Sequence, residues 1–418
     1  MNRCDAVRSK PGVGACCRAA CLAAVASLAV APPAAAQSST AFADTSTRAG
    51  TIAAMQAEKA RSLKPRAPHR AERIVKWVQD EFIDEPSGFY PVFGSVYPGG
   101  GFALGAGYRR YYGDNTHWDA KVLQSIRNNR LLEVSTTSWN HAGGRVDLQA
   151  RAGWRDAPGV AFHGLGIDSP EDATGFGLSQ RYAGGDMTFR PAPRTHLRAG
   201  LLYEDYSLGD RSGARPAIGG VHTPETAPSL GTSPSYVHLT GAAGYDWRPS
   251  PGYARTGGLY EIRYHHYAAA SGGADDFNRL EGEIVQHLPL VRENYVLSLR
   301  GQAETTLDDD AMVPFYLISS LGGSDTLRGY PSWRFRDRHA ALSTVELRWI
   351  PNRNSVDVAL FYDAGMVAPR WDDIALRRFR SDVGIGVRFH APRATPLRIE
   401  VAKGREGLRL VFAGSAAF

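Results

Sequence analysis

The sequence predicts an all-β fold: a sixteen-stranded antiparallel transmembrane β-barrel with a short N-terminal helical extension. Three observations predict it. Runs of alternating apolar and polar residues repeat from residue 86 to the end of the chain. The connections between these runs are long and short in turn, as in bacterial outer-membrane barrels. The chain also begins with a segment that has the form of an export signal.

The composition argues against two other classes of protein. The chain has 418 residues, of which 43% are hydrophobic and 10% aromatic. Outside the N-terminus, no apolar run reaches the roughly 18 residues that a membrane-spanning helix needs. The formal net charge of +6 comes from scattered basic residues, so no nucleic-acid partner is expected. Basic side chains facing a barrel lumen or an acidic lipid surface account for this charge equally well.

Residues 1–36 are predicted to be a cleavable signal peptide. Basic residues precede a short apolar segment at 19–31, which leads to an Ala-x-Ala site ending at Ala36. The apolar segment is too short to anchor the chain across a membrane, and Cys21 does not follow it as a lipoprotein cysteine would. The four cysteines of the chain all precede the cleavage site: Cys4, Cys16, Cys17 and Cys21. We therefore expect export to the outer membrane without any disulfide framework.

Residues 37–85 are predicted to be a disordered or helical periplasmic extension. Residues 37–50 are rich in Ser, Thr and Ala, and helices are expected over 51–63 and 70–83. In the second helix, apolar residues recur at spacings of three and four and form a narrow stripe. The stripe fits a helix that packs on the barrel rim, or a plug or lipid-surface helix.

From residue 86 to residue 418 the period changes to two, which predicts the barrel domain. The runs are about as long as the roughly 9–11 residues of a tilted membrane strand. A soluble β-sandwich would alternate similarly but with shorter strands. The sixteen expected strands are 88–97, 102–112, 116–128, 130–140, 143–155, 176–190, 195–208, 235–248, 257–269, 277–289, 294–306, 339–350, 355–365, 381–390, 396–403 and 408–418.

The alternation and the connections both agree with lipid outside and water inside. Within 397–401, Leu397, Ile399 and Val401 share one face. Arg398 and Glu400 share the opposite face, which is predicted to be the lumen. The long connections fall at alternate gaps, as expected for outer loops opposite short periplasmic turns. These long connections are 156–175, 209–234, 307–338 and 366–380.

The last expected strand ends in an aromatic residue. Its alternation places Leu408, Leu410, Phe412 and Phe418 on one face. A terminal aromatic residue on an alternating strand resembles the signal by which outer-membrane barrels are recognised for insertion. We therefore expect Phe418 to serve as the barrel-insertion signal, with the outer-membrane insertion machinery as a partner during biogenesis.

The connection 307–338 carries the most specific motif of the chain. It contains Leu327-Arg328-Gly329-Tyr330 after a Gly-Gly turn. It resembles the lumen-folded loop of the BamA/TamA/FhaC superfamily, the bacterial surface antigen type of barrel. The run Phe361 to Gly365 resembles the aromatic-x-Asp-x-Gly strand motif of that family. The strand that contains Glu346 resembles the segment carrying its inner-wall glutamate.

The resemblance implies that Arg328 enters the lumen, and the chemistry of the wall residues agrees. A buried arginine has to be paired, and alternation places Glu346 and Asp363 on the lumen face. Phe361 shares their parity, so its ring can face the guanidinium. Gly329 permits a tight turn before Tyr330. We expect a structural lock of the lumen rather than a catalytic site, the alternative being an exposed loop arginine.

The resemblance implies a role in assembly or transport at the outer membrane, but one family feature does not fit. Members that insert or secrete proteins carry periplasmic POTRA domains, and residues 37–85 are too few to form one. In this respect the chain resembles the barrel-only branch of the family. A passive pore or structural barrel is the alternative function, and a soluble enzyme is a third. Outer-membrane lipids and lipopolysaccharide are the expected surroundings. No catalytic motif, cofactor site or metal site is expected.

Overall fold

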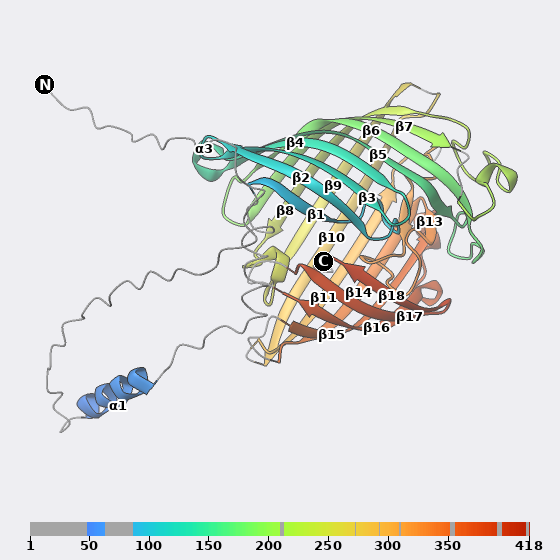
Figure 1. Cartoon of the computed structure of the whole chain (residues 1–418). Coiled ribbons are helices and arrows are strands. Elements are labelled where there is room, and N and C mark those ends of the chain that lie inside the picture. Colours follow the sequence, from blue (N-terminus) through green and yellow to red (C-terminus); the bar gives the residue numbers. More distant parts are fainter. Residues whose placement is uncertain are drawn as a thin grey trace, which may run out of the picture. The chain divides into compact units, whose positions relative to one another are not determined.

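The structure is a computed structural model that describes residues 48–62, 87–209, 213–271, 273–291, 293–308, 311–351, 356–390, 395–414 and 418. Within these residues a 16-stranded antiparallel sheet follows the order of the chain, as Figure 1 shows. The predicted fold class is therefore confirmed. The sheet passes directly from β11 to β14, because β12 and β13 form a separate two-stranded hairpin between them.

The strands of the large sheet are mostly 10 to 17 residues long, and its shortest are at its two edges. They are β1 (Gly88–Gly94), β2 (Ala103–Tyr112), β3 (Thr116–Ser125), β4 (Arg130–Asn140), β5 (Val146–Phe162), β6 (Thr174–Phe189), β7 (Thr195–Gly209), β8 (Ser235–Asp246), β9 (Gly257–Ser271), β10 (Phe277–Val291), β11 (Tyr295–Thr306), β14 (His339–Trp349), β15 (Val356–Ala368), β16 (Arg380–Phe389), β17 (Leu397–Gly404) and β18 (Gly407–Ala413).

Helices are few in the described residues. Helix α1 (Arg48–Ser62) covers nearly the same residues as the helix expected at 51–63. The signal peptide and the second expected helix lie outside the described residues. The short helical turns of the barrel connections are α3 (His141–Gly144), η2 (Ile218–Gly220), η3 (Pro251–Tyr253), η4 (Trp371–Asp373) and η5 (Leu376–Arg378). No helix in the described part of the chain is long and apolar enough to cross a membrane.

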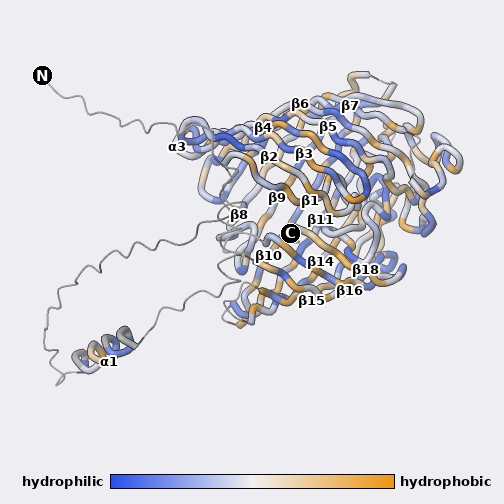
Figure 2. The backbone as a smooth tube through the Cα atoms, viewed as in Figure 1, coloured by the Kyte–Doolittle hydropathy of each residue, from blue (hydrophilic) through white to orange (hydrophobic). Residues whose placement is uncertain are grey.

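The two faces of the sheet differ in chemistry, and β15 is a clear case. Leu360 and Tyr362 are about half exposed, whereas Phe361 and Asp363, which alternate with them, are buried. Figure 2 shows hydrophobic and hydrophilic residues alternating along the strands in the same way. In a membrane the outward side chains contact lipid and the inward ones line the lumen. The predicted inward parity of the last strands is therefore correct.

The connections are longer at one end of the barrel, which we call the outer end. Its connections are 95–102, 126–129, 163–173, 210–234, 272–276, 307–338, 369–379 and 405–406. We call 95–102 the first outer turn, 163–173 outer loop 3, 307–338 loop 6, 369–379 outer loop 7 and 405–406 the last outer turn. The predicted alternation of long and short connections is confirmed.

Several strand boundaries differ from the prediction, most of all those of β5 and β18. The connection expected at 156–175 is shorter, because β5 continues to Phe162 and β6 already begins at Thr174. The pairing of β5 and β6 shifts register between Ala157 and Val160. This bulge accommodates Pro158 and Gly159, which otherwise suggest a turn. The last strand is shorter than expected and ends at Ala413.

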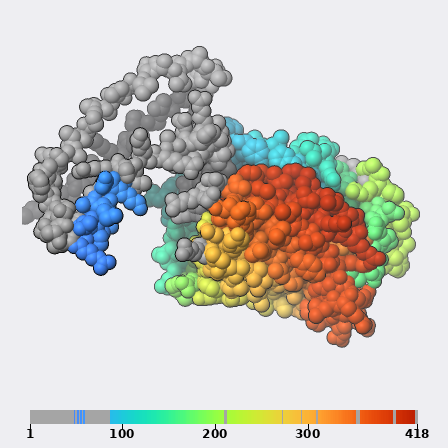
Figure 3. All heavy atoms as spheres, turned by 90° about the horizontal axis from the view of Figure 1, so that it is seen from below, coloured from blue at the N-terminus to red at the C-terminus, as the bar shows by residue number. Residues whose placement is uncertain are grey.

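Apolar side chains of loop 6 pack inside the barrel against residues of its wall. Val313, Phe315 and Ile318 belong to a buried cluster with aromatic residues of the barrel wall. The ring of Phe315 lies 4.8 Å from the ring centroids of both Phe162 and Phe176. The last third of the chain forms the continuous orange and red wall in Figure 3. Loop 6 thus packs against β5 and β6.

The two edge strands of the sheet, β1 and β18, have no backbone pairing with each other in the described residues. Both are only 7 residues long. Figure 1 shows them, in blue and red, as the two ends of the curved sheet. The barrel is nearly closed, with an unpaired seam between its first and last strands.

Candidate functional site

Loop 6 turns sharply before its tip, and two glycines make the turn. Its strands β12 (Ser319–Leu321) and β13 (Phe335–Asp337) pair with Leu321 opposite Phe335. Gly322 and Gly323 follow with φ of +113° and +109°, where residues with a Cβ are strained. A Cβ on Gly322 would lie 2.1 Å from the carbonyl oxygen of Pro331. The Gly-Gly pair therefore directs residues 324–330 into the lumen.

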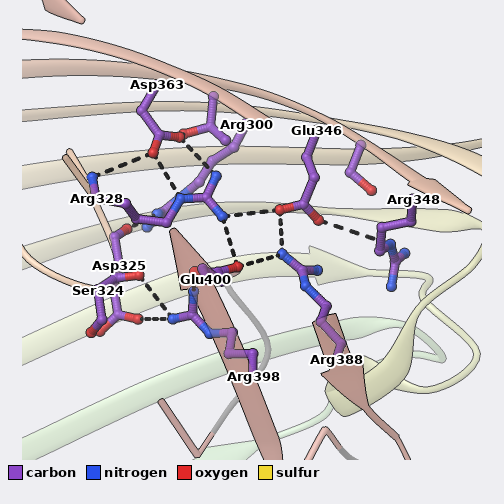
Figure 4. A network of polar contacts seen from close by, with 12 residues as sticks. Arg300, Ser324, Asp325, Arg328, Glu346, Arg348, Asp363, Arg388, Arg398 and Glu400 are labelled. Carbon is purple, nitrogen blue, oxygen red and sulfur yellow. Dashed lines mark hydrogen bonds and ion pairs between the residues drawn. The ribbon is translucent and has the colours of Figure 1, made fainter. Parts of the chain in front are cut away.

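The guanidinium of Arg328, at the loop tip, is buried among three carboxylates and one ring (Figure 4). Its Nε and Nη2 donate to the two carboxylate oxygens of Asp363 at 2.7 and 2.9 Å. Its Nη1 donates to Glu346 at 3.1 Å and to Glu400 at 3.2 Å. The centroid of the Phe361 ring lies 3.4 Å from the guanidinium carbon. The planar fork of arginine fits this arrangement, because each nitrogen has its own acceptor.

The partners of Arg328 lie on three strands, each at a position whose side chain faces the lumen. Glu346 lies on β14, Phe361 and Asp363 lie on β15, and Glu400 lies on β17. Strand β16, between β15 and β17, has small residues at the facing positions. A Cβ on Gly384 would lie 2.2 Å from the Phe361 ring, and one on Gly386 would lie 2.6 Å from Cγ of Glu400. These glycines leave room for both side chains.

Further arginines surround the acidic residues. Arg388 contacts Glu346 and donates to Glu400 at 3.2 Å. Arg398 donates to Glu400 at 2.8 Å and to Asp325 of the loop at 2.6 Å. Buried charges are tolerated when they are paired and hydrogen-bonded in this way. The result is a network of alternating charge that joins the loop to β14, β15, β16 and β17, as Figure 4 shows.

Gly329 and Tyr330 seat the tip against the wall. A Cβ on Gly329 would lie 2.5 Å from Cβ of Asp382 and 2.7 Å from the backbone nitrogen of Gly404. The hydroxyl of Tyr330 donates to the carbonyl of Ser381 at 3.2 Å and accepts from the backbone N–H of Arg405 at 3.3 Å. Only a residue without a side chain fits at position 329.

Two of the outer-loop groups with shifted pKa values, His163 and Arg336, lie near the contact of outer loop 3 with loop 6. Burial, together with the nearby charges of Arg334 and Arg336, lowers the pKa of His163 to about 4. Burial alone lowers the pKa of the Arg336 guanidinium to about 9. Arg336 instead donates to the carbonyl of Phe315 at 3.0 Å and lies over the ring of Trp333. The two loops are joined beside these groups, because the backbone N–H of Gly166 in outer loop 3 donates to the carbonyl of Arg336 at 2.8 Å.

The structure brings Arg328, Glu346, Phe361 and Asp363 together, with Gly329 and Tyr330 beside them. Phe418 lies elsewhere than expected. Leu408, Leu410 and Phe412 are exposed on the outer face. The ring of Phe418 stacks on that of His287 at 6.0 Å. The expectation of one shared face is wrong, because the strand ends at Ala413 and its alternation does not extend to Phe418.

Sequence reasoning missed four members of the network: Asp325, Arg388, Arg398 and Glu400. Parity placed Arg398 and Glu400 inside the barrel but did not indicate which inward residues meet the loop tip. Inward position combined with charge is the signal that could have found them. Among the described residues, no group of three or more His, Asp, Glu or Cys side chains is arranged to hold a metal ion.

Comparisons with known proteins point to one family. The family model for the Omp85 superfamily domain matches residues 112–407. The fold resembles that of BamA from Haemophilus ducreyi lacking POTRA domains 1–3, with a TM-score of 0.59 and 16% identity over 79% of this chain and 71% of that one.

CdiB from Escherichia coli is a second structure of similar fold. It has a TM-score of 0.52 and 11% identity over 78% of this chain. The match spans only 61% of the CdiB chain. At such identities the likeness concerns the fold alone. A search of curated proteins found no match.

Proposed function

The chain belongs to the Omp85 superfamily, and from this premise we propose that it assembles or transports a client polypeptide at the outer membrane through the seam between β1 and β18. The observation that carries the proposal is the absence of pairing between these two strands among the described residues. Unpaired backbone groups are costly in a lipid environment. An extended segment of a client can pair with an exposed sheet edge and satisfy them.

The outward faces of both edges support a seam that contacts lipid. Phe89 and Phe93 on β1 are exposed by 83% and 62%. Leu408 and Leu410 on β18 are exposed by 69% and 55%. A client strand entering between them finds apolar neighbours on the lipid side. Short edge strands separate with the loss of few contacts, which favours a seam that opens.

In this proposal the Arg328 network is the lock that holds one side of the seam. It ties the loop tip to β14, β15 and β17 through Glu346, Asp363 and Glu400. The last strands then move as one body, and β1 moves against them. Arg328, Gly329, Tyr330 and Phe361 serve this structural role and take part in no chemical reaction.

The experiment that tests the proposal closes the seam covalently. Cysteines replace Phe93 on β1 and Leu408 on β18, near the outer ends of the two strands, and a bifunctional thiol reagent joins them. The natural cysteines all lie within residues 1–36. The variants are expressed in a strain that lacks the protein. We expect the crosslinked form to fail to restore the wild-type profile of outer-membrane proteins and lipids. Each single-cysteine form should restore the wild-type profile. Full restoration by the joined form would overturn the proposal.

A passive pore is the second candidate, and the filling of the lumen opposes it. Phe315 of loop 6 lies in the apolar cluster with wall residues of both β5 and β6. We expect low conductance in planar bilayers for the wild type and higher, fluctuating conductance for Arg328→Ala. A steady, large conductance of the wild-type protein would favour the pore instead.

We also propose the route by which the chain reaches this membrane. Residues 1–36 direct export and are removed, residues 37–85 form a periplasmic extension, and residues 86–418 form the barrel in lipopolysaccharide and phospholipid. The insertion machinery recognises the last strand through Phe418. Phe418→Ser should lower the fraction of protein in the outer membrane, measured by membrane fractionation, and an unchanged fraction would contradict this role.

A further inference from the structure

We propose that residues 331–334 of loop 6 form a clasp across the outer end of the seam. The clasp fastens the first outer turn, which precedes β2, to the last outer turn, which precedes β18. Its release would then permit the seam to open at that end. The inference rests on the proposed function only for what the opening serves. The fastening itself follows from contacts on both sides of the seam.

On the β18 side, the clasp is an ion pair. The Nε of Arg334 donates to the two carboxylate oxygens of Glu406 at 2.8 and 3.0 Å. Glu406 lies in the last outer turn, directly before β18 begins at Gly407. The terminal nitrogens of Arg334 donate to the hydroxyl and carbonyl of Ser169 in outer loop 3, at 2.8 and 2.9 Å. The side chain of Arg334 is 2% exposed and that of Glu406 15%, so this pair is largely shielded from water and salt.

On the β1 side, the clasp is a packing contact. The ring of Trp333 meets that of Tyr97 edge-on, with centroids 6.1 Å apart. Tyr97 is buried and lies in the first outer turn. In the same turn, a Cβ built on Gly99 would lie 2.9 Å from Cβ of Ser332. The backbone of Gly99 therefore lies close against the side chain of Ser332, and adjacent clasp residues contact opposite edges of the seam.

The backbone of the clasp is strained at Trp333, which has φ of +58°. Bulky residues rarely adopt this left-handed conformation unless the surroundings hold them in it. Here Arg336 lies 5.0 Å from the Trp333 ring, and the N–H of Arg334 donates to the carbonyl of Pro331 at 3.1 Å. The strained turn points the side chains of Trp333 and Arg334 to different edges. It also favours a change of conformation once either contact is lost.

The clasp and the Arg328 network have different tasks. The network joins the loop tip to the inner wall of β14, β15 and β17, away from β1. The clasp follows the tip by a few residues and is the part of loop 6 that contacts both edge turns. Loss of the clasp should therefore open the outer end of the seam while Arg328 stays paired.

The test measures distances across the seam by pulsed electron paramagnetic resonance, in the full chain with its four natural cysteines replaced by serine and reconstituted in liposomes. One pair of spin labels sits at Phe93→Cys and Leu408→Cys, near the outer ends of β1 and β18. A second pair sits at Phe89→Cys and Phe412→Cys, near the other ends. All four side chains are exposed on the outer face, so the labels leave the lumen undisturbed.

Two variants break the clasp from opposite sides. Glu406→Gln removes the charge with little change in size, and Tyr97→Leu removes the ring contact. We expect both to lengthen and broaden the outer distance and to change the other distance less. Asp168→Asn is the matched control, because it removes ion pairs to Arg378 of outer loop 7 and Arg380 of β16 that do not involve an edge turn. It should leave the outer distance as in the wild type.

The proposal is overturned if the outer distance stays unchanged in both clasp variants, or if Asp168→Asn changes it equally. Slower gel migration on heating identifies the folded barrel of each variant. If one clasp variant does not fold, the other gives the same answer from the opposite edge. The result does not depend on a client polypeptide. The distances show whether the clasp holds the seam, even if the crosslinking experiment shows that no client passes through it.

Discussion

At the scale of single residues, Arg328 of loop 6 forms ion pairs with three buried carboxylates. Its replacement by alanine leaves Asp363 buried without its main partner, whereas Glu346 and Glu400 retain Arg388. Removing one member of a buried pair costs about 3–5 kcal/mol. We expect Arg328→Ala to lower the unfolding free energy by roughly this amount, and Arg328→Lys by less, because lysine keeps the charge but lacks the fork.

Denaturant unfolding in detergent micelles measures the unfolding free energies of the wild type and the two variants. Arg263→Ala is the matched control, since Arg263 also pairs with inner-wall carboxylates, among them Glu261 and Glu281, but those lie on β9 and β10. Both alanine variants should be destabilised. Only Arg328→Ala should make loop 6 sensitive to added protease, and equal sensitivity in the two variants would contradict a specific lock.

His163 should make the packing of outer loop 3 depend on pH. Its pKa is lowered to about 4 in the folded protein, below the ordinary value near 6.5. The unfolded state therefore binds a proton more readily, so stability falls as the pH drops below about 6.5 and levels off below about 4. We expect the melting temperature of the barrel to fall over this interval.

The measurement compares the melting temperatures of wild type and His163→Gln at pH 7.5, 5.5 and 4.5. Glutamine cannot take up the proton, so the variant should lose part of the decline. Carboxylates contribute the remaining decline in both proteins. Identical pH profiles would show that His163 does not couple to the fold.

The residue-level predictions from sequence succeeded where alternation and a motif acted together. Arg328, Glu346, Phe361 and Asp363 do meet, because parity fixes which side chains face inward. The contact with Glu400 needed the stagger of the strands around the barrel, which alternation does not contain. Phe418 was misplaced because parity holds only as long as the strand continues.

At the scale of elements, the turn between β8 and β9 closes against the opposite wall. Tyr253 of η3 donates to Asp357 at 2.7 Å and stacks on His390 with ring centroids 3.9 Å apart. Thr395 donates to the carbonyl of Gly252 at 3.0 Å. Burial and Asp357 raise the pKa of the Tyr253 hydroxyl, so it remains a donor at neutral pH. This turn narrows the end of the lumen opposite loop 6.

We expect Tyr253→Phe to lower the unfolding free energy by about 1–3 kcal/mol, because a buried carboxylate loses its donor. Tyr253→Ala should cost about 3–5 kcal/mol, since the ring is lost as well. Urea unfolding in micelles measures both. Tyr260→Phe is the control, because its hydroxyl donates to Gln286 at an exposed site. If Tyr253→Phe lowers the unfolding free energy no more than Tyr260→Phe does, the hydrogen bond of Tyr253 does not stabilise this turn.

Most elements were predictable because their pattern is long. All sixteen wall strands were expected, since each presents several repeats of the two-residue period. The hairpin of β12 and β13 escaped notice because each strand has only 3 residues, too few to show a period. The β5–β6 bulge escaped because Pro158 and Gly159 have the chemistry of a turn, and only the pairing of β6 reveals that the strand continues.

At the scale of the whole molecule, the two edges of the seam are held unequally. On the side of β18, Tyr330 bonds to the backbone of Arg405, and Arg334 pairs with Glu406. On the side of β1, the hydroxyl of Tyr90 donates to Asp119 on β3 at 2.5 Å. Loop 6 is thus tied to the β18 side by a hydrogen bond and an ion pair, whereas it meets the β1 side through the packing of Trp333 on Tyr97, so local openings should occur at β1 first.

Hydrogen exchange on the folded barrel measures this asymmetry, and we expect the amides of β1 to exchange faster than those of β18. Tyr90→Phe should speed exchange in β1 further, because it removes the hydroxyl that holds the strand to Asp119. The control is Tyr182→Phe, which loses a comparable contact with Glu133 between β6 and β4, away from the seam. It should leave exchange in β1 unchanged. Faster exchange in β18 than in β1 would mean that the lock side moves first, and the roles of the two edges would be reversed.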